Sequence, residues 1–379
     1  MSQSIKAETV DGEVSGGTDG FEGEVRMQWP VVIPLRLHLL IDMARGSGSA
    51  IEEVSTAYPR ISIGPESAVG IGLEKIPFIV SDYDDRAGYA TDFLGVELPL
   101  PDISDESTIG TMKDGNPVIP YEHFSVVLNK HRRMAWYTAS NVDGSSKKRR
   151  PEPGDYSRKG LGELGSASET WVVDPRVSIE YQLSDQFYNK DRGSFDKGHI
   201  VRREDVCWGD SRLQIQKANG DTFHLTNCSP QVGNFNRSNL GGIWGKLEDE
   251  VLGQLKKSKG RYSIFAGPAY ADSDPEFTGW SETGSIIVNI PQEYWKVISF
   301  QDDGELRTFA FVLRQSLKNV RFEEVFSLIS DWAPYLVSLE YLESRLEGVE
   351  FPDELHDADQ FDTDAASELL SSTILRRQK

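Results

Sequence analysis

The sequence predicts an α+β fold, and two observations support this class. Residues 123–142 contain two strand-like segments separated by a short polar turn, which is typical of a β-hairpin. Further along, strand-like segments at 199–205 and 222–227 precede a segment with helical periodicity at 243–257. Hairpin strands followed by a helix, without regular alternation of strand and helix, favour α+β over a doubly wound α/β fold.

Each element follows from its own pattern, taken in chain order. Residues 31–44 mix apolar residues with Arg36 and His38, which predicts a buried strand running into a short helix. Residues 76–100 are apolar runs broken by turn residues, which predicts short strands. In the expected helix, apolar residues recur at helical spacing at Ile243, Leu247, Val251, Leu252 and Leu255. One face of that helix should therefore be buried.

We expect four segments. Residues 1–25 are Gly-rich and acidic with few large apolar groups, so we expect a disordered tail. Residues 26–75 form an N-terminal extension and a candidate regulatory segment, and residues 76–357 form the main domain. Residues 358–379 are expected to be an acidic C-terminal tail. The wider stretch from Glu350 to Glu368 holds eight acidic residues and no Lys or Arg, which predicts a solvated segment.

Charge is unevenly distributed along the chain. The formal net charge is -20, from 40 Lys and Arg against 60 Asp and Glu, and by itself it argues against a polyanionic partner. Residues 130–212, however, hold 16 Lys and Arg against 13 Asp and Glu, a local balance of +3. An anionic ligand is therefore expected to bind in the middle of the chain.

The sequence also predicts the cellular location and the state of the two cysteines. No run of eighteen apolar residues occurs, so no membrane span is expected. The first twenty residues lack the basic and apolar regions of a secretory signal, so we expect a cytoplasmic location. Cys207 and Cys228 fit neither a disulfide framework nor a four-ligand zinc site, and we expect two reduced buried thiols.

His199 is the first candidate for chemistry. It follows Gly198 and is flanked by Asp196, Lys197, Arg202 and Arg203. An imidazole beside several cations resists protonation, so His199 is better suited to act as a neutral base than as a cation. The neighbouring cations indicate an anionic ligand.

Amide side chains provide the second component. Asn227, Asn234 and Asn236 carry neutral oxygen ligands, which suit a hard ion such as Mg2+ that keeps most of its waters. A neutral base, a hard cation and flanking Arg and Lys residues are the groups needed to cleave a phosphodiester.

Several short motifs in this region and beyond it are informative when they are taken together, in their order along the chain. They are D-K-G-H at 196–199, T-N-C-S-P-Q at 226–231, F-N at 235–236 and W-G-K-L-E at 244–248. Five further segments extend from about Arg86 toward Asp357: RAGYATDFLG (86–95), HFSVVLNKHRR (123–133), WVVDPR (171–176), FAGPAY (265–270) and IPQEYWKVI (290–298). Together they resemble the DNA/RNA non-specific endonucleases, the relatives of endonuclease G with a ββα-metal (His-Me finger) site.

The resemblance implies a fold and a role for each site residue. The fold would be a central mixed or antiparallel sheet flanked by helices. His199 would be the general base, Asn236 the direct ligand of a single Mg2+ that Mn2+ could replace, and Glu248 would act through metal-bound water. Asn227 would position the base or the phosphate. Substrate binding would fall to Lys197, Arg202, Arg176 and Asp196.

The sequence departs from the family pattern at two cations. Lys197 stands where relatives usually have Arg, and lysine offers a point charge instead of a two-pronged fork to phosphate. Glu169 stands two residues before Trp171, where some relatives have a phosphate-binding Arg. Arg202 and Arg176 are the alternatives for that role.

The spacing of the metal residues also departs from simple expectation. Asn236 and Glu248 are twelve residues apart, which on one straight helix would separate them by about 18 Å. A loop at Gly241–Gly242, with the helix starting near Ile243, would remove this difficulty. Asn239 is then a rival metal ligand.

Three functions remain open on the sequence alone. The first is a Mg2+-dependent endonuclease that cleaves DNA and RNA without sugar preference, with a restrained effector in defence or cell killing as its expected context. The second is a catalytically silent nucleic-acid-binding or interaction protein on the same fold, and the third is a phosphodiesterase for small substrates. The resemblance also implies a homodimer. We expect a regulatory protein partner at the N-terminal extension, or inhibition by the acidic tail.

Overall fold

The computed structural model describes residues 82–158, 160–162, 171–190, 195–281, 284–317, 335–346 and 348–361. The predicted tail at 1–25, the extension at 26–75, the strand and helix expected at 31–44, and residues 362–379 lie outside these ranges. No helix within them has the length and apolar character needed to span a bilayer.

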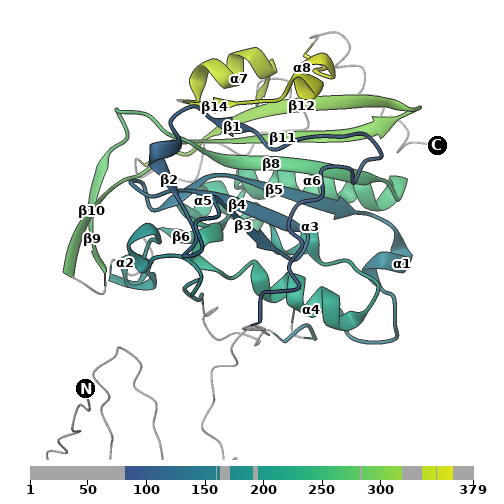
Figure 1. Cartoon of the computed structure of the whole chain (residues 1–379), viewed down its shortest axis with the longest axis horizontal. Helices are drawn as coiled ribbons and strands as arrows, with labels where there is room; N and C mark the ends of the chain where they lie inside the picture. Colours follow the sequence, from purple (N-terminus) through teal and green to yellow (C-terminus); the bar gives the residue numbers. More distant parts are fainter. Residues whose placement is uncertain are drawn as a thin grey trace, which may run out of the picture. The chain divides into compact units, whose positions relative to one another are not determined.

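An eight-stranded antiparallel sheet is the centre of the described chain (Figure 1). The strand order is β13-β12-β11-β8-β5-β4-β2, and β3 pairs with the same strand β4. The predicted hairpin is confirmed as β4 and β5. The strand bounds are β2 (Ile109–Gly110), β3 (Val118–Tyr121), β4 (Phe124–Asn129), β5 (Met134–Asp143), β8 (Arg261–Ala269), β11 (Glu293–Asp302), β12 (Glu305–Arg314) and β13 (Leu336–Val337).

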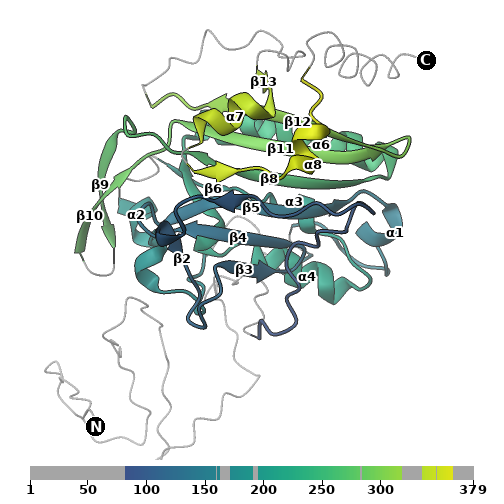
Figure 2. The same ribbon diagram turned by 45° about the horizontal axis from the view of Figure 1, so that its top comes forward.

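Helices cover both faces of this sheet. Because side chains alternate along a strand, Tyr294 and Ile298 of β11 pack with α6 (Ile243–Ser258), whereas Trp295 and Val297 point to the other face. On that other face lie α7 (Leu339–Arg345) and α8 (Asp353–Asp357), as Figures 1 and 2 show. The sheet therefore separates α6 from the C-terminal helices.

The stretch that begins at Glu350 is not a solvated tail where the structure describes it. β14 (Val349–Glu350) pairs with β1 (Asp102–Ile103), and Phe351, Leu355 and Ala358 are buried. The Thr308 amide donates to the Ala358 carbonyl at 2.9 Å. Phe351, Leu355 and Ala358 recur at a spacing of three to four residues, which gives the segment a buried face. The prediction considered the number of acidic residues and not this spacing. The solvated interpretation is wrong for residues 350–361.

The remaining elements surround the sheet. The strands expected at 76–100 are absent from residues 82–100, which form turns and extended chain. The other helices and strands are η1 (Glu106–Thr108), α1 (Ser146–Arg149), η2 (Ile179–Tyr181), α2 (Asp185–Lys190), β6 (Asp196–His199), α3 (Arg203–Val206), α4 (Arg212–Asp221), η3 (Leu225–Asn227), β7 (Cys228–Gln231), α5 (Gly233–Asn236), η4 (Ser238–Leu240), β9 (Glu276–Ser281) and β10 (Gly284–Asn289).

The order strand, strand, helix is confirmed, but both strands were predicted a few residues out of place. They are β6 and β7 rather than 199–205 and 222–227, since α3 begins at Arg203 and η3 occupies 225–227. Pairing, not strand propensity, decides these positions. At Gly198 a Cβ atom would lie 2.2 Å from Gln231 Oε1, so only glycine lets the Gln231 side chain cross the strand.

Candidate active site

His199 ends β6, opposite Cys228 of β7. Its ring packs against the rings of Trp171 and Phe223, with centroids 4.4 and 5.1 Å away. The Nε2 atom is buried and makes no hydrogen bond within the described ranges. A buried nitrogen without a partner is costly, which marks it as a position where a further group is expected to bind.

The surroundings keep the His199 imidazole neutral. Burial, together with the positive charges of Arg158, Arg203 and Arg202, lowers the pKa of His199 to about 3. Arg158 is exposed and contributes the largest of these charge effects. The sequence did not single out Arg158, because it lies in a Gly-, Pro- and Ser-rich stretch with no motif.

Asn227 fixes the chain that follows His199. Its Oδ1 accepts from the Val201 amide at 2.8 Å, and its Nδ2 donates to the carbonyls of Val201 and Thr222, both at 3.0 Å. The Ile200 amide donates to the Asn227 carbonyl at 3.1 Å. Asn227 is completely buried. These contacts favour the positioning of the base over contact with phosphate, the two roles that the sequence left open.

Asn236 ends α5 and is oriented by Asp196 at the start of β6. Its Nδ2 donates to Asp196 Oδ2 at 3.0 Å, and Arg237 Nε donates to the same oxygen at 2.7 Å. The amide thus has its nitrogen engaged, while Oδ1 accepts no hydrogen bond from the described residues. Asp196, predicted to bind substrate, is therefore occupied with Asn236 and Arg237. The rival Asn239 lies exposed in η4.

Two glycines bring α6 against α5. The predicted loop is present: Gly241 has a φ of 85°, and α6 begins at Ile243. A Cβ atom on Gly242 would lie 2.4 Å from the Phe235 carbonyl oxygen, and one on Gly245 would lie 2.5 Å from the Asn236 carbonyl oxygen. Since residues three apart share a helix face, Glu248 follows Gly245 on the side of α6 that meets Asn236.

Gly245→Ala should separate α6 from α5. The added methyl group overpacks the contact with Asn236, and we expect a loss of about 1–3 kcal/mol in unfolding free energy. Gly253→Ala is the matched control on the same helix, since nothing lies within 4 Å of its Cβ position. That control should stabilise the protein by up to about 1 kcal/mol. Urea denaturation measures both, and equal shifts in the two variants would refute the close approach.

Glu248 is buried beneath this contact. Its Oε1 lies 3.4 Å from Lys296 Nζ. Burial raises the pKa of Glu248 to about 7, against the opposing charges of Lys296 and Arg202. Arg202 also pairs with Glu204 at 3.0 Å and with Asp249 at 2.5 Å. Arg202 thus links the end of β6 to α6.

The other two predicted substrate cations are held by carboxylates. Lys197 forms an ion pair with Asp185 of α2. Arg176 pairs with Asp174 at 2.8 Å, and its guanidinium carbon lies 4.2 Å from the Tyr83 ring centroid. No contact within the described chain joins Arg176 to His199, Asn236 or Glu248. The structure therefore groups the other predicted residues around β6, β7 and α6 and leaves Arg176 in a separate cluster.

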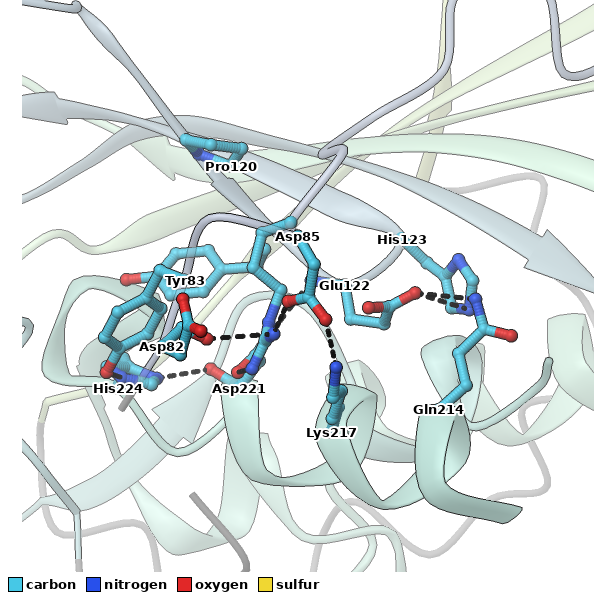
Figure 3. A network of polar contacts seen from close by, with 12 residues as sticks. Asp82, Tyr83, Asp85, Pro120, Glu122, His123, Gln214, Lys217, Asp221 and His224 are labelled. Carbon is cyan, nitrogen blue, oxygen red and sulfur yellow. Dashed lines mark hydrogen bonds and ion pairs between the residues drawn. The ribbon is translucent and has the colours of Figure 1, made fainter. Parts of the chain in front are cut away.

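A buried polar network that the sequence did not predict supports the turn before η3, the short helix that ends at Asn227 (Figure 3). Arg86 Nε donates to Asp221 Oδ2 at 2.6 Å, and both side chains are inaccessible to solvent. Tyr83 Oη lies 2.7 Å from His224 Nε2, and His224 Nδ1 lies 2.9 Å from the Asp221 carbonyl oxygen. His224 is buried. Residues 83–86 are thereby fastened to the turn that leads into β7.

Comparison with known proteins identifies the family. The model of the family "DNA/RNA non-specific endonuclease" matches residues 106–358. The uncharacterized protein y4fB of Sinorhizobium fredii is 35% identical over 62% of this chain and 33% of its own length. Nuclease 1, mitochondrial, of Schizosaccharomyces pombe is 28% identical over 47% of this chain and 50% of its own. This chain therefore spans half or less of these two relatives.

Two further proteins are similar to this chain. Nuclease C1 of Cunninghamella echinulata is 32% identical over 54% of this chain and 72% of its own length. A chain in the crystal structure of the EndoG/EndoGI complex has a TM-score of 0.45 and 19% identity, covering 65% of this chain and 90% of that one. Since the family model spans well over half of its residues, the chain belongs to the DNA/RNA non-specific endonuclease family, and the predicted α+β, ββα-metal fold is confirmed.

Proposed function

We propose that the protein is a metal-dependent endonuclease that hydrolyses phosphodiester bonds in both DNA and RNA. The observation that carries the proposal is the buried Nε2 of a neutral His199, which has no hydrogen-bond partner among the described residues. His199 stands at the end of a strand whose first residue orients Asn236. The nucleases among the relatives support the same reaction class.

The residues of the site have separate roles in hydrolysis. The neutral His199 imidazole takes a proton from the attacking water, which a protonated ring would not do. The charges of Arg158, Arg202 and Arg203 favour the approach of a phosphate and stabilise the negative charge that it gains. Asn227 acts at a distance by holding the chain after His199 in place.

The donor set fits a hard divalent cation. Asp196 engages the nitrogen of the Asn236 amide, which leaves a neutral oxygen as ligand. No group of three or more His, Cys, Asp or Glu side chains suited to a metal occurs in the described ranges, so the candidate ligand is this single amide, completed by water. Mg2+ accepts such a water-rich shell, and Mn2+ should replace it. Bound there, the ion would stabilise the leaving oxygen.

The function is tested on three substrates. We expect the full-length protein to nick supercoiled plasmid and to degrade single-stranded RNA with Mg2+, and to do neither in EDTA. Little sequence preference is expected, because phosphate contacts carry no base information. Hydrolysis of a nucleotide ester alone would instead support a small-substrate phosphodiesterase. Binding of nucleic acid without cleavage would support a silent binding protein.

Asn236→Ala should weaken metal binding. Removal of the amide oxygen is expected to lower Mn2+ affinity by about tenfold or more, measured from the free Mn2+ signal by electron paramagnetic resonance. Asn239→Ala is the matched control and should bind Mn2+ as the unmodified protein does. The reverse result would assign the ligand to Asn239.

Location, assembly and restraint are further proposals. We propose a cytoplasmic enzyme, a homodimer, that is restrained by a protein partner at residues 1–75. Residues 350–361 pack on the sheet face opposite α6, so we restrict the proposal of inhibition by the acidic tail to residues 362–379.

Deletion of residues 362–379 should raise activity if this segment inhibits the enzyme. Unchanged activity after the deletion would exclude inhibition by this segment.

A further inference from the structure

Five exposed cations gather where α1 meets the C-terminal end of α6. Two belong to the run KKRR at 147–150, and three follow Leu255 near the end of α6. They form the α1–α6 basic cluster: Lys147, Arg150, Lys256, Lys257 and Lys259. None of them forms an ion pair within the described ranges. In a chain with a net charge of -20, such a cluster marks a surface that suits an anionic partner.

Backbone contacts hold the two parts of the cluster together. Gly144, just before α1, approaches α6 so closely that a Cβ atom there would lie 2.3 Å from the Leu255 carbonyl oxygen. The Gly144 amide also donates to the Gly260 carbonyl at 2.9 Å, directly after α6. Because only glycine permits this approach, the fold itself brings the run KKRR beside the lysines of α6.

The cluster is joined to the strand that carries His199. Arg149, of the same run, binds the end of α3: its Nη2 donates to the Asp205 carbonyl at 3.1 Å, and its Nη1 donates to the Glu204 carbonyl. α3 begins at Arg203, four residues after His199, and its four residues span about 6 Å. The cluster therefore lies beside the proposed catalytic strand.

A second connection runs along α6. Arg202, one of the cations around His199, pairs with Asp249 at 2.5 Å. Lys256 lies about two turns after Asp249, on the same face of the helix. Partial burial and the positive charges of Arg149 and Arg202 lower the pKa of Lys256. Cations at such close range repel one another, and an anion bound among them would offset that repulsion.

We propose that the α1–α6 basic cluster binds the phosphate backbone of a nucleic acid duplex outside the bond that is cleaved. The inference rests on the proposed function and deepens it, since the cluster holds the substrate to one side of His199. A polyanion with regularly repeated charges fits cations spread over two elements better than a single phosphate does. Contacts of this kind position a duplex without reading its sequence.

A structural role is the alternative, because lysines near the end of a helix stabilise its last carbonyl groups. Lys259 separates the two roles. It follows α6 with a φ of 55°, a left-handed conformation that suits Gly or Asn better than Lys. Lys259→Asn should therefore keep or raise the melting temperature while DNA binding weakens. A lower melting temperature with unchanged binding would contradict the inference.

Binding in EDTA tests the cluster without metal or cleavage. A labelled DNA of about 30 base pairs is titrated with the full-length protein between about 50 and 200 mM salt, and fluorescence anisotropy gives the affinity. In Lys147→Gln/Arg150→Gln the slope of log affinity against log salt should become shallower by about 2, and the affinity at about 100 mM salt should fall about tenfold or more.

Lys113→Gln/Arg345→Gln is the matched control. It also removes one exposed Lys and one exposed Arg, but Lys113 follows β2 and Arg345 lies on α7, on the sheet face opposite α6. This variant should bind DNA as the unmodified protein does. Equal losses in the two double variants would mean that overall charge governs binding, and would overturn the inference.

The remaining outcomes keep the inference separate from the proposed function. Tighter DNA binding by the cluster variants would mean that an acidic segment of the chain occupies the cluster, which also overturns the inference. If the unmodified protein cleaves plasmid but the cluster variants bind DNA as it does, or if it binds no DNA in EDTA, the inference fails alone. If binding falls as expected and the unmodified protein cleaves nothing, the proposed function fails alone.

Discussion

His199→Ala should lower the rate of plasmid and RNA cleavage by at least about 100-fold while the protein remains folded. General-base catalysis contributes about 100- to 10,000-fold, and no other imidazole contacts this part of β6 among the described residues. The loss should extend across neutral pH, because a pKa of about 3 keeps His199 neutral there. Initial rates with saturating Mg2+ measure the effect.

The matched control is His356→Ala. His356 lies on α8, on the opposite face of the sheet, where its Nε2 is 3.2 Å from Glu343 Oε2. This variant should cleave at the unmodified rate. If His199→Ala also cleaves at that rate, with circular dichroism showing both variants folded, His199 is not the base.

Arg86→Met should have the largest effect on stability. The Arg86–Asp221 pair is fully buried, and removing one partner leaves an unpaired buried carboxylate. We expect a loss of about 3–5 kcal/mol in unfolding free energy, measured by urea denaturation. Cleavage should also weaken, because Asp221 lies at the end of α4, just before the turn that carries His224 and Asn227.

A neighbouring ion pair provides the comparison. Lys217 pairs with Asp85, whose side chain is 54% exposed. Because exposed pairs contribute about 0–1 kcal/mol, Lys217→Met should change stability little. Equal losses in Lys217→Met and Arg86→Met would mean that burial of the Arg86 pair is not what stabilises this segment.

The sequence predicted those elements whose positions depend on residues close together in the chain. The start of α6 followed from Gly241–Gly242 and the apolar spacing after them, and β4 and β5 followed from their alternation around a turn. β6 and β7 were displaced because their positions depend on their mutual pairing, which no local pattern reports. Residues 350–361 were misjudged because charge was weighed above the apolar spacing of Phe351, Leu355 and Ala358.

In the site, too, local motifs predicted the residues, but they did not predict the contacts between distant parts of the chain. Motifs led to His199, Asn227, Asn236 and Glu248, and the structure places all four on or beside the β6, β7 and α6 unit. The supporting contacts were missed because they join distant parts of the chain. Arg86 is 135 residues from Asp221, and Lys296 is 48 residues from Glu248. No periodicity reports such pairs, and Arg158 lies in a loop without a pattern.

Anomalous diffraction from a crystal soaked in Mn2+ tests the proposed site most directly. We expect one strong peak next to Asn236 Oδ1, with the His199 ring facing the same opening and not bound to the ion. A peak at Asn239, a peak with His199 Nε2 as ligand, or an Asn236 side chain that shares no opening with His199 would contradict the proposed assignment of base and metal ligand.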